Sequence, residues 1–192
     1  AGARCSRTCS AKRATCCIHN TGSICRVRTG ARAMTLSPTQ LASDFEAVFA
    51  SFPDTPADAA DALAQAYGDY AAAGVFGSST PAIPPASVTA LASTLRTAIA
   101  TPAAGSPAAF AAAWSVGLTA LWIGVPVSGA MSGATIGCPG AVALVAPLTA
   151  VFANLANTAA SCAAGLATAL HSATITTTAA LAPPPGTILP IA

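Results

Sequence analysis

The second half of this chain carries no charged side chain, and this restricts its fold more than any other feature. Arg96 is the last Lys, Arg, Asp or Glu of the 192 residues, so residues 97–192 consist mainly of Ala, Gly, Ser, Thr, Pro and aliphatic residues. Two apolar runs, 107–125 and 139–152, flank a glycine-rich connection. A surface without charge is poorly soluble and tends to associate. This half must therefore pack against itself, against other protein chains or into lipid.

Charges and cysteines divide the chain near Met34. Residues 1–33 contain seven of the eight basic residues and no acid, whereas residues 34–192 contain one base against six acids, a net charge of −5. Five of the seven cysteines also precede Met34. We therefore predict three parts: a basic Cys-rich N-terminal segment (1–33), a helical domain (34–172) and a strand-like, extended tail (173–192).

Four interpretations of residues 1–33 remain open. The basic residues could neutralise nucleic-acid phosphates, or the segment could be an Arg- and Ser-rich transit peptide. It could also bind a metal. The residues that could act as ligands are Cys5, Cys9, Cys16, Cys17, His19 and Cys25. Their spacing matches no paired C-x2-C framework, and no aromatic residue is present to stack on bases. We favour a disordered or mistranslated leader with translation starting at Met34, because the chain begins without Met and its composition changes there.

Three helices are predicted between Met34 and residue 100. Ser37-Pro38-Thr39-Gln40 has the form of a capping box and predicts a helix over 38–52, with Asp44 and Glu46 near its favoured N-terminal end. Thr55-Pro56 begins a second helix that ends at Gly74, and Ser87 caps a third. The apolar faces expected for them are Leu41, Phe45, Val48, Phe49 and Phe52; Leu63, Ala66, Tyr67 and Tyr70; and Val88, Leu91, Leu95 and Ile99.

Further predictions for this region concern the loop after the second helix, the position of Arg96 and the packing of alanine-rich helices. Phe76 and Ile83 in the loop over 75–86 should fill gaps in the core, and Arg96 should lie on the outer face near the acidic second helix. From Met34 onward 45 of 159 residues are Ala. Because Ala favours helix but buries little area, the core must come from close approach of helices.

The uncharged half is predicted to add three more helices and a tail. Ser106-Pro107 starts a fourth helix, whose apolar face is Phe110, Trp114, Leu118, Leu121, Trp122 and Val125. The five-glycine stretch 124–140 is expected to be a loop containing a tight turn. Pro139 starts a fifth helix kinked at Pro147, and Asn157 or Thr158 caps a sixth that includes Cys162, Leu166 and Leu170. Residues 174–178 are β-branched and strand-like. The Pro-rich tail is either a docking strand for a neighbouring subunit or packs along its own domain.

Residues 107–125 are the best candidate for a membrane segment, but a buried helix is favoured. Residues 108–125 are 18 uncharged residues, at the short end of what a bilayer requires. Six of them are strongly apolar, and each contributes only about −0.3 to −0.6 kcal/mol to insertion. Ser115, Gly117, Thr119 and Gly124 oppose insertion, and no nearby Lys or Arg sets an orientation. A hairpin over 107–153 in lipid remains the alternative.

Few residues after Met34 could support catalysis. The titratable candidates are six acids, His171, Cys138 and Cys162. A Cys–His nucleophile pair would need His171 beside Cys138 or Cys162. Cys162 is nine residues from His171, over two helical turns, so those two should not touch. Because no G-x-S-x-G, H-E-x-x-H or P-loop motif is present, we expect no enzyme, no catalytic, cofactor-binding or metal-binding residue, and no nucleic-acid partner for 34–192.

One stretch suggests a family. The run from Gly137-Cys-Pro-Gly-Ala to Phe152-Ala-Asn-Leu-Ala-Asn-Thr-Ala-Ala, together with Leu170-His171 and the Pro-Pro-Pro-Gly tail, resembles small uncharacterised Ala-rich helical proteins of phage-tail or contractile-injection gene clusters. The likeness covers most of 34–192. It implies a part in an assembly, with no assigned activity and no functional residue.

Together these features predict an all-α protein, a five- to six-helix bundle in which the fourth and fifth helices form the centre and the first three form a charged outer wall. Its expected role is that of a non-catalytic structural or assembly subunit of a larger, phage-like or injection-system-like particle, which associates with itself or with protein partners. The alternatives are the membrane-inserted hairpin and a small monomeric binding domain that uses the tyrosines of the second helix.

Overall fold

A computed structural model of the chain describes residues 36–51, 53–100, 106–154, 156–181 and 188–191. The predictions for residues 1–33, including the metal, nucleic-acid and leader interpretations, lie outside these ranges, as does the prediction for Phe52. Residues 32–192 belong to one compact unit, and the description below concerns that unit.

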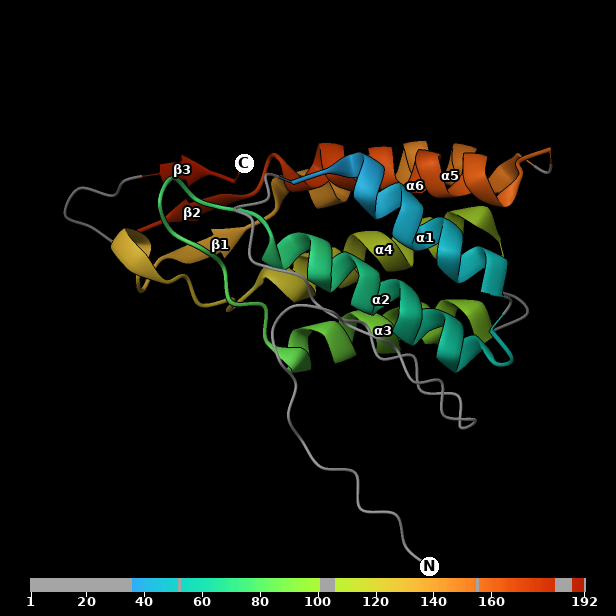
Figure 1. Cartoon of the computed structure of the whole chain (residues 1–192), viewed down its shortest axis with the longest axis horizontal. Helices are drawn as coiled ribbons and strands as arrows, with labels where there is room; N and C mark the ends of the chain where they lie inside the picture. Colours follow the sequence, from blue (N-terminus) through green and yellow to red (C-terminus); the bar gives the residue numbers. More distant parts are fainter. Residues whose placement is uncertain (1–35, 52, 101–105, 155, 182–187, 192) are drawn as a thin grey trace, which may run out of the picture. The chain divides into compact units, whose positions relative to one another are not determined.

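The described chain is mostly helical, as predicted, and contains six α-helices (Figure 1). They are α1 (Pro38–Ser51), α2 (Pro56–Ala72), α3 (Pro85–Ala100), α4 (Pro107–Trp122), α5 (Val145–Ala153) and α6 (Ala159–Thr174). Two 3₁₀ helices, η2 (Gly129–Met131) and η3 (Pro139–Leu144), lie between α4 and α5. The bounds of α1, α2 and α4 match the sequence prediction to within about a turn.

Hydroxyl side chains begin the helices where the sequence indicated. The side chains of Thr55, Ser106 and Thr158 each accept a hydrogen bond from a backbone N–H three residues later, and Pro occupies the first turn of α2 and α4. Ser37 likewise accepts from the Gln40 backbone at 3.2 Å. The Gln40 side chain bonds to Asp44 rather than back to Ser37, so only half of the capping box forms.

Two local predictions near the helix starts were wrong. Helix α3 begins at Pro85, ahead of Ser87, because the Pro84 carbonyl accepts hydrogen bonds from the backbone N–H groups of Ser87 and Val88. In α1, neither Asp44 nor Glu46 lies in the first turn, where the helix dipole would favour an acid.

The predicted fifth helix is divided in two. Residues 139–144 form the 3₁₀ helix η3, and α5 begins only at Val145. Pro147 therefore lies in the first turn of α5, where a missing backbone N–H costs little. It marks the change from 3₁₀ to α geometry rather than a kink in the middle of a helix.

A small sheet lies at one end of the helices (Figure 1). It contains β1 (Thr135–Gly137), β2 (Thr178–Ala180) and β3 (Ile188–Pro190), all antiparallel in the order β1-β2-β3. The prediction of a strand over 174–178 was shifted, because α6 continues through Thr174, whose hydroxyl donates to the Leu170 carbonyl within the helix. The loop predicted over 124–140 holds both η2 and β1.

The described end of the tail packs along its own domain. β3 pairs with β2, and Ala179 lies opposite Leu189. The Ile191 N–H donates to the Thr177 carbonyl at 2.9 Å, and Ile191 bridges to Phe76 with its side chain buried. Of the two arrangements left open by the sequence, residues 188–191 adopt the one within the chain.

Helix α4 supplies the largest buried side chains of the core, whereas α5 contributes little to it. Trp114, Leu118, Leu121 and Trp122 of α4 are fully buried, whereas Leu148 is the one buried residue of α5. Helix α6 packs against α1, and α3 lies between α2 and α4. The prediction of α5 as a central helix was wrong, because α5 spans only Val145–Ala153 and covers α4 from outside.

Other packing predictions were confirmed. Phe76 is buried and Ile83 packs against the core from a half-buried position. Arg96 lies on the outer face of α3 and donates to Asp61 of α2 at 2.9 Å, with both side chains about half exposed. An exposed pair of this kind contributes at most about 1 kcal/mol to stability.

Candidate functional site

Cys138 and His171, two of the titratable side chains of the uncharged half, have different hydrogen-bond partners. The Cys138 thiol is buried and donates to the Ala173 carbonyl at 3.6 Å, whereas His171 Nδ1 is hydrogen-bonded to the Tyr70 hydroxyl. Cys162 lies at the start of α6, and both it and Cys138 are free thiols. Within the described residues, the Cys–His nucleophile pair considered from the sequence is therefore not assembled.

Burial also works against thiol chemistry. Desolvation raises the pKa of Cys138, and the pKa of Cys162 is raised for the same reason. The thiolate is the nucleophilic form and the metal-binding form of cysteine, and a raised pKa disfavours that form. In the described part of the chain no group of three or more His, Cys, Asp or Glu residues could hold a metal ion.

The tyrosines of α2 face the core and join it to α4 and α6. Tyr67 is fully buried, and its hydroxyl lies 3.1 Å from Trp122 Nε1 and 2.8 Å from Thr174 Oγ1. Because the Thr174 hydroxyl donates its proton to the Leu170 carbonyl at 2.7 Å, Tyr67 must donate to Thr174 and accept from Trp122. Burial raises the pKa of Tyr67 and Tyr70 far above their usual value, so both remain neutral hydrogen-bonding groups. The binding surface that we considered for α2 is thus part of the core.

His171 is the one histidine in the described chain, and its protonation should affect stability. Desolvation lowers the pKa of His171 below its ordinary value of 6.5. The folded state therefore binds fewer protons than the unfolded state, so stability is highest above pH 6.5 and falls as the pH drops through that value towards the lower folded pKa.

The loss of stability at low pH can be measured as a decrease in the free energy of unfolding in urea between about pH 7.5 and pH 5.5. The variant His171→Gln keeps an acceptor for Tyr70 and cannot titrate, so we expect its pH dependence to be weaker than that of the wild type. Equal pH dependence of the two proteins would show that His171 does not control this loss of stability.

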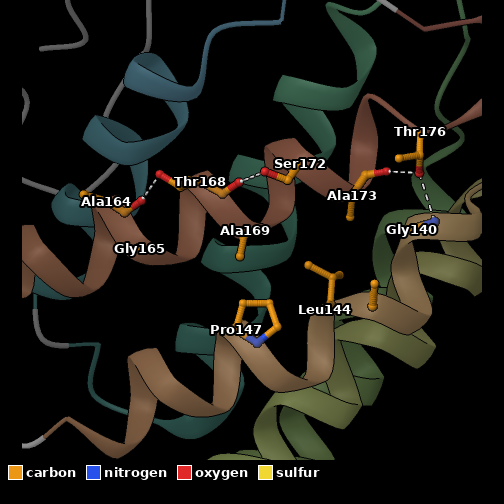
Figure 2. A pocket seen from close by; sticks show the side chains of 11 residues that line it. Gly140, Leu144, Pro147, Ala164, Gly165, Thr168, Ala169, Ser172, Ala173 and Thr176 are labelled. Carbon is orange, nitrogen blue, oxygen red and sulfur yellow. Dashed lines mark hydrogen bonds between the residues drawn. The ribbon is translucent and has the colours of Figure 1, made fainter.

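A surface depression of the described chain lies between α6 on one side and η3 and α5 on the other. This groove has a volume of about 520 Å³. Its lining contains no charged side chain and consists of Gly140, Ala143, Leu144, Pro147, Ala164, Gly165, Thr168, Ala169, Ser172, Ala173 and Thr176. Figure 2 shows Leu144 and Pro147 facing the α6 side chain of Ala169 across it. We call it the α6 groove.

The hydroxyl groups of the α6 groove are already hydrogen-bonded within the chain. Thr168 donates to the Ala164 carbonyl at 2.8 Å, and Ser172 donates to the Thr168 carbonyl at 2.9 Å (Figure 2). Thr176 donates to Ala173 and accepts from the Gly140 N–H. The groove therefore presents methyl and methylene groups of small side chains and leaves no hydroxyl proton in need of a ligand.

A second, shallower groove lies between α3 and α4. Its volume is about 440 Å³, and it is lined by Ser93, Thr94, Thr97, Ala98, Ala109, Ala112, Ala113 and Val116. We call it the α3–α4 groove.

Four large apolar side chains are exposed in the described chain: Val116 (61 %), Ile123 (66 %), Val142 (77 %) and Ile175 (46 %). All four follow Arg96, in the half without charge.

The sequence carried a signal for the α6 groove that residue-type motifs do not reveal. Ala164, Thr168 and Ser172 recur at intervals of four, so they lie along one stripe of α6. A stripe of small residues predicts close approach of some neighbour but not which one. Its partner surface on η3 could not be predicted, because the sequence indicated one continuous helix there.

No described helix is long and apolar enough to cross a lipid bilayer. Most of the large apolar side chains of α4, among them Trp114, Leu118 and Trp122, are buried in the core, and α4 packs against α3 and α5. No protein-family model matches the chain, and the comparisons with curated proteins and with solved structures gave no match either. The site must therefore be interpreted from its own geometry.

Proposed function

We propose that this protein is a non-catalytic structural subunit and that copies of it associate through the half of the chain without charge. One observation carries the proposal. The described residues after Arg96 expose four large apolar side chains, form the whole lining of the α6 groove and most of the lining of the α3–α4 groove, and include no charged residue to keep that surface in water. Exposed apolar surface of this kind is typical of a protein–protein contact.

Two further features support a structural role. The thiols have raised pKa values, and His171 is hydrogen-bonded to Tyr70 rather than to either thiol. The resemblance to Ala-rich proteins of phage-tail or contractile-injection clusters favours the same role, and membership in such a particle remains part of the proposal.

The oligomeric mass of the full chain tests the proposal. The mass of a single chain is 18.5 kDa. We expect light scattering coupled to size exclusion to give a multiple of this mass, and the number of chains per particle should stay constant or increase as the protein concentration is raised. Because the contact is expected to be apolar rather than ionic, added salt should not dissociate it. A mass of one chain at every concentration would contradict the proposal, as would dissociation by moderate salt alone.

A further inference from the structure

We infer that residues 188–191 are an exchangeable strand, which fills the same slot in a second copy of this chain. We call these residues the tail strand, and the slot that takes them, formed by β2, Gly74 and Phe76, the tail slot. The inference rests on the proposed function and goes beyond it by naming the segment that one copy gives to the next. The fit of this occupant is visible within one chain, where the tail strand already lies in the slot.

Backbone groups hold the tail strand in the slot. β2 and β3 are antiparallel, and Thr178 lies opposite Pro190. The Ile191 N–H also donates to the Thr177 carbonyl at 2.9 Å. Addition of an extended segment to the edge of a sheet is a common mode of peptide recognition, in which the main chain supplies affinity and side-chain pockets supply specificity. The tail slot therefore has the form of a strand-binding site.

The side chain of Ile191 supplies the specificity. It is 3 % exposed and bridges to the buried Phe76, whose ring packs edge-on against Trp122 at a centroid distance of 6.4 Å. A Cβ atom added to Gly74 would lie 2.8 Å from Ile191 Cγ1, a closer approach than such atoms tolerate. The slot accepts this side chain only because position 74 has none. A second copy of the chain necessarily carries the residue that fits.

The connection between β2 and β3 favours exchange over a return to the same chain. An exchanged pair keeps every contact of the slot, so exchange costs no interaction there. Because β2 and β3 are antiparallel, a tail strand that returns to its own chain requires a reversal of the backbone within residues 181–187. Residues 182–187 lie outside the described ranges, but their sequence includes Pro183-Pro184-Pro185. Successive prolines favour extended backbone, in which seven residues span roughly 20 Å. A short connection that resists reversal promotes exchange between copies.

Two matched substitutions measure the contact between the slot and the tail strand. Gly74→Ala fills the slot, and Ile191→Ala shortens the side chain that occupies it. Gly74 is not among the described glycines with positive φ, so alanine introduces no backbone strain there. The double variant combines a smaller slot with a smaller side chain, so we expect it to be less destabilised than the sum of the single variants. Urea unfolding gives this coupling, and circular dichroism establishes that each variant is folded.

Mixing the full-length variants shows whether the contact forms between copies. Gly74→Ala and Ile191→Ala chains are unfolded together in urea and refolded. In an exchanged heterodimer, the filled slot of the first chain receives the shortened strand of the second, and the two unchanged parts also meet. Both slots then fit, whereas neither slot fits in either homodimer. We expect native mass spectrometry to show heterodimers enriched by about tenfold or more over random pairing.

The reciprocal mixture is the control. When the wild type is refolded with the double variant, each homodimer has two fitting slots and an exchanged heterodimer has none. Heterodimers should therefore be depleted by a similar factor. Association through any surface other than the tail slot gives random pairing in both mixtures.

A second measurement does not depend on Gly74. Thr178 and Pro190 lie opposite each other outside the core, one half-buried and one exposed, so Thr178→Cys combined with Pro190→Cys can be joined by mild oxidation. Isotope-labelled and unlabelled copies of this double variant are refolded together before oxidation. Exchange gives linked 178–190 peptides that join a labelled copy to an unlabelled one. Should Gly74→Ala not fold, this measurement decides.

The outcomes distinguish the inference from the proposed function. If the wild type associates but both mixtures pair at random, or every linked peptide comes from one copy, the exchange is wrong while the subunit role stands. Additive effects of Gly74→Ala and Ile191→Ala would also overturn the inference, because the slot would then not select the side chain of Ile191. A wild type with the mass of one chain at every concentration would overturn both.

Discussion

Replacing Tyr67 by Phe should lower the free energy of unfolding by about 2 kcal/mol, although it removes a single oxygen atom. That oxygen accepts from Trp122 Nε1 and donates to Thr174 Oγ1, and all three side chains are fully buried. Without it the indole N–H of Trp122 has no acceptor in a region closed to water. The cost of an unsatisfied buried donor, about 1–3 kcal/mol, then applies in full. For a domain of this size the midpoint of thermal unfolding should fall by roughly 4–8 °C.

Tyr70→Phe is the matched control for this prediction. The same atom is removed from the same helix, but its partner, Nδ1 of His171, belongs to a half-buried ring that solvent reaches. Water can replace the lost hydroxyl, so we expect a loss of only about 0.5–1 kcal/mol. Urea unfolding followed by tryptophan fluorescence at one fixed protein concentration measures both, since association would stabilise the folded state. Equal losses in the two variants would refute the role assigned to the Tyr67 hydroxyl.

Gly140→Ala is the second change with a large expected effect, a loss of about 2–4 kcal/mol. A Cβ atom at position 140 would lie 2.8 Å from the Ala173 Cα and 2.9 Å from its carbonyl oxygen. Both are backbone atoms, so the overlap can be relieved only by moving η3 away from α6. That movement would also lengthen the hydrogen bond from the Gly140 N–H to Thr176 Oγ1, now 2.9 Å.

Gly137→Ala provides the comparison, three residues earlier in β1. No atom lies within 4 Å of a Cβ placed there, and Gly137 is not among the described glycines with positive φ. We expect a change within about 0.5 kcal/mol in either direction. Thermal and urea unfolding of the two alanine variants would compare them directly. Similar stabilities would mean that η3 and α6 do not approach as closely as the structure shows.

The parts of the fold that were predicted correctly depend on local chemistry. Thr55, Ser106 and Thr158 mark helix starts because a hydroxyl followed by backbone N–H groups is sufficient to cap a helix. The apolar stripe of Leu63, Tyr67 and Tyr70 was also correctly assigned to the inner face of α2. In both cases residues within two turns of each other carry the information.

The predictions that failed depend on distant partners. Pro147 indicates an interruption of the predicted fifth helix but not its form. The contact of Gly140 with Ala173 and Thr176, which accompanies the 3₁₀ helix over residues 139–144, joins residues more than 30 positions apart. Residues 174–178 are β-branched, yet Thr174 remains helical because its hydroxyl bonds to Leu170 and Tyr67. The α6 groove was missed for the same reason, since it exists only where η3 and α5 lie beside α6.

The pairing of α1 with α6 has a consequence for how the chain reaches this structure. Leu41 and Phe45 of α1 are buried against a bundle whose sixth helix is synthesised more than a hundred residues later. Closing so long a loop is entropically costly, so the rate of folding should depend on this late event rather than on the fast local helices. During synthesis the face of α1 that packs against α6 stays exposed until α6 has left the ribosome. We therefore expect chaperones that bind exposed apolar segments to bind this chain during that time.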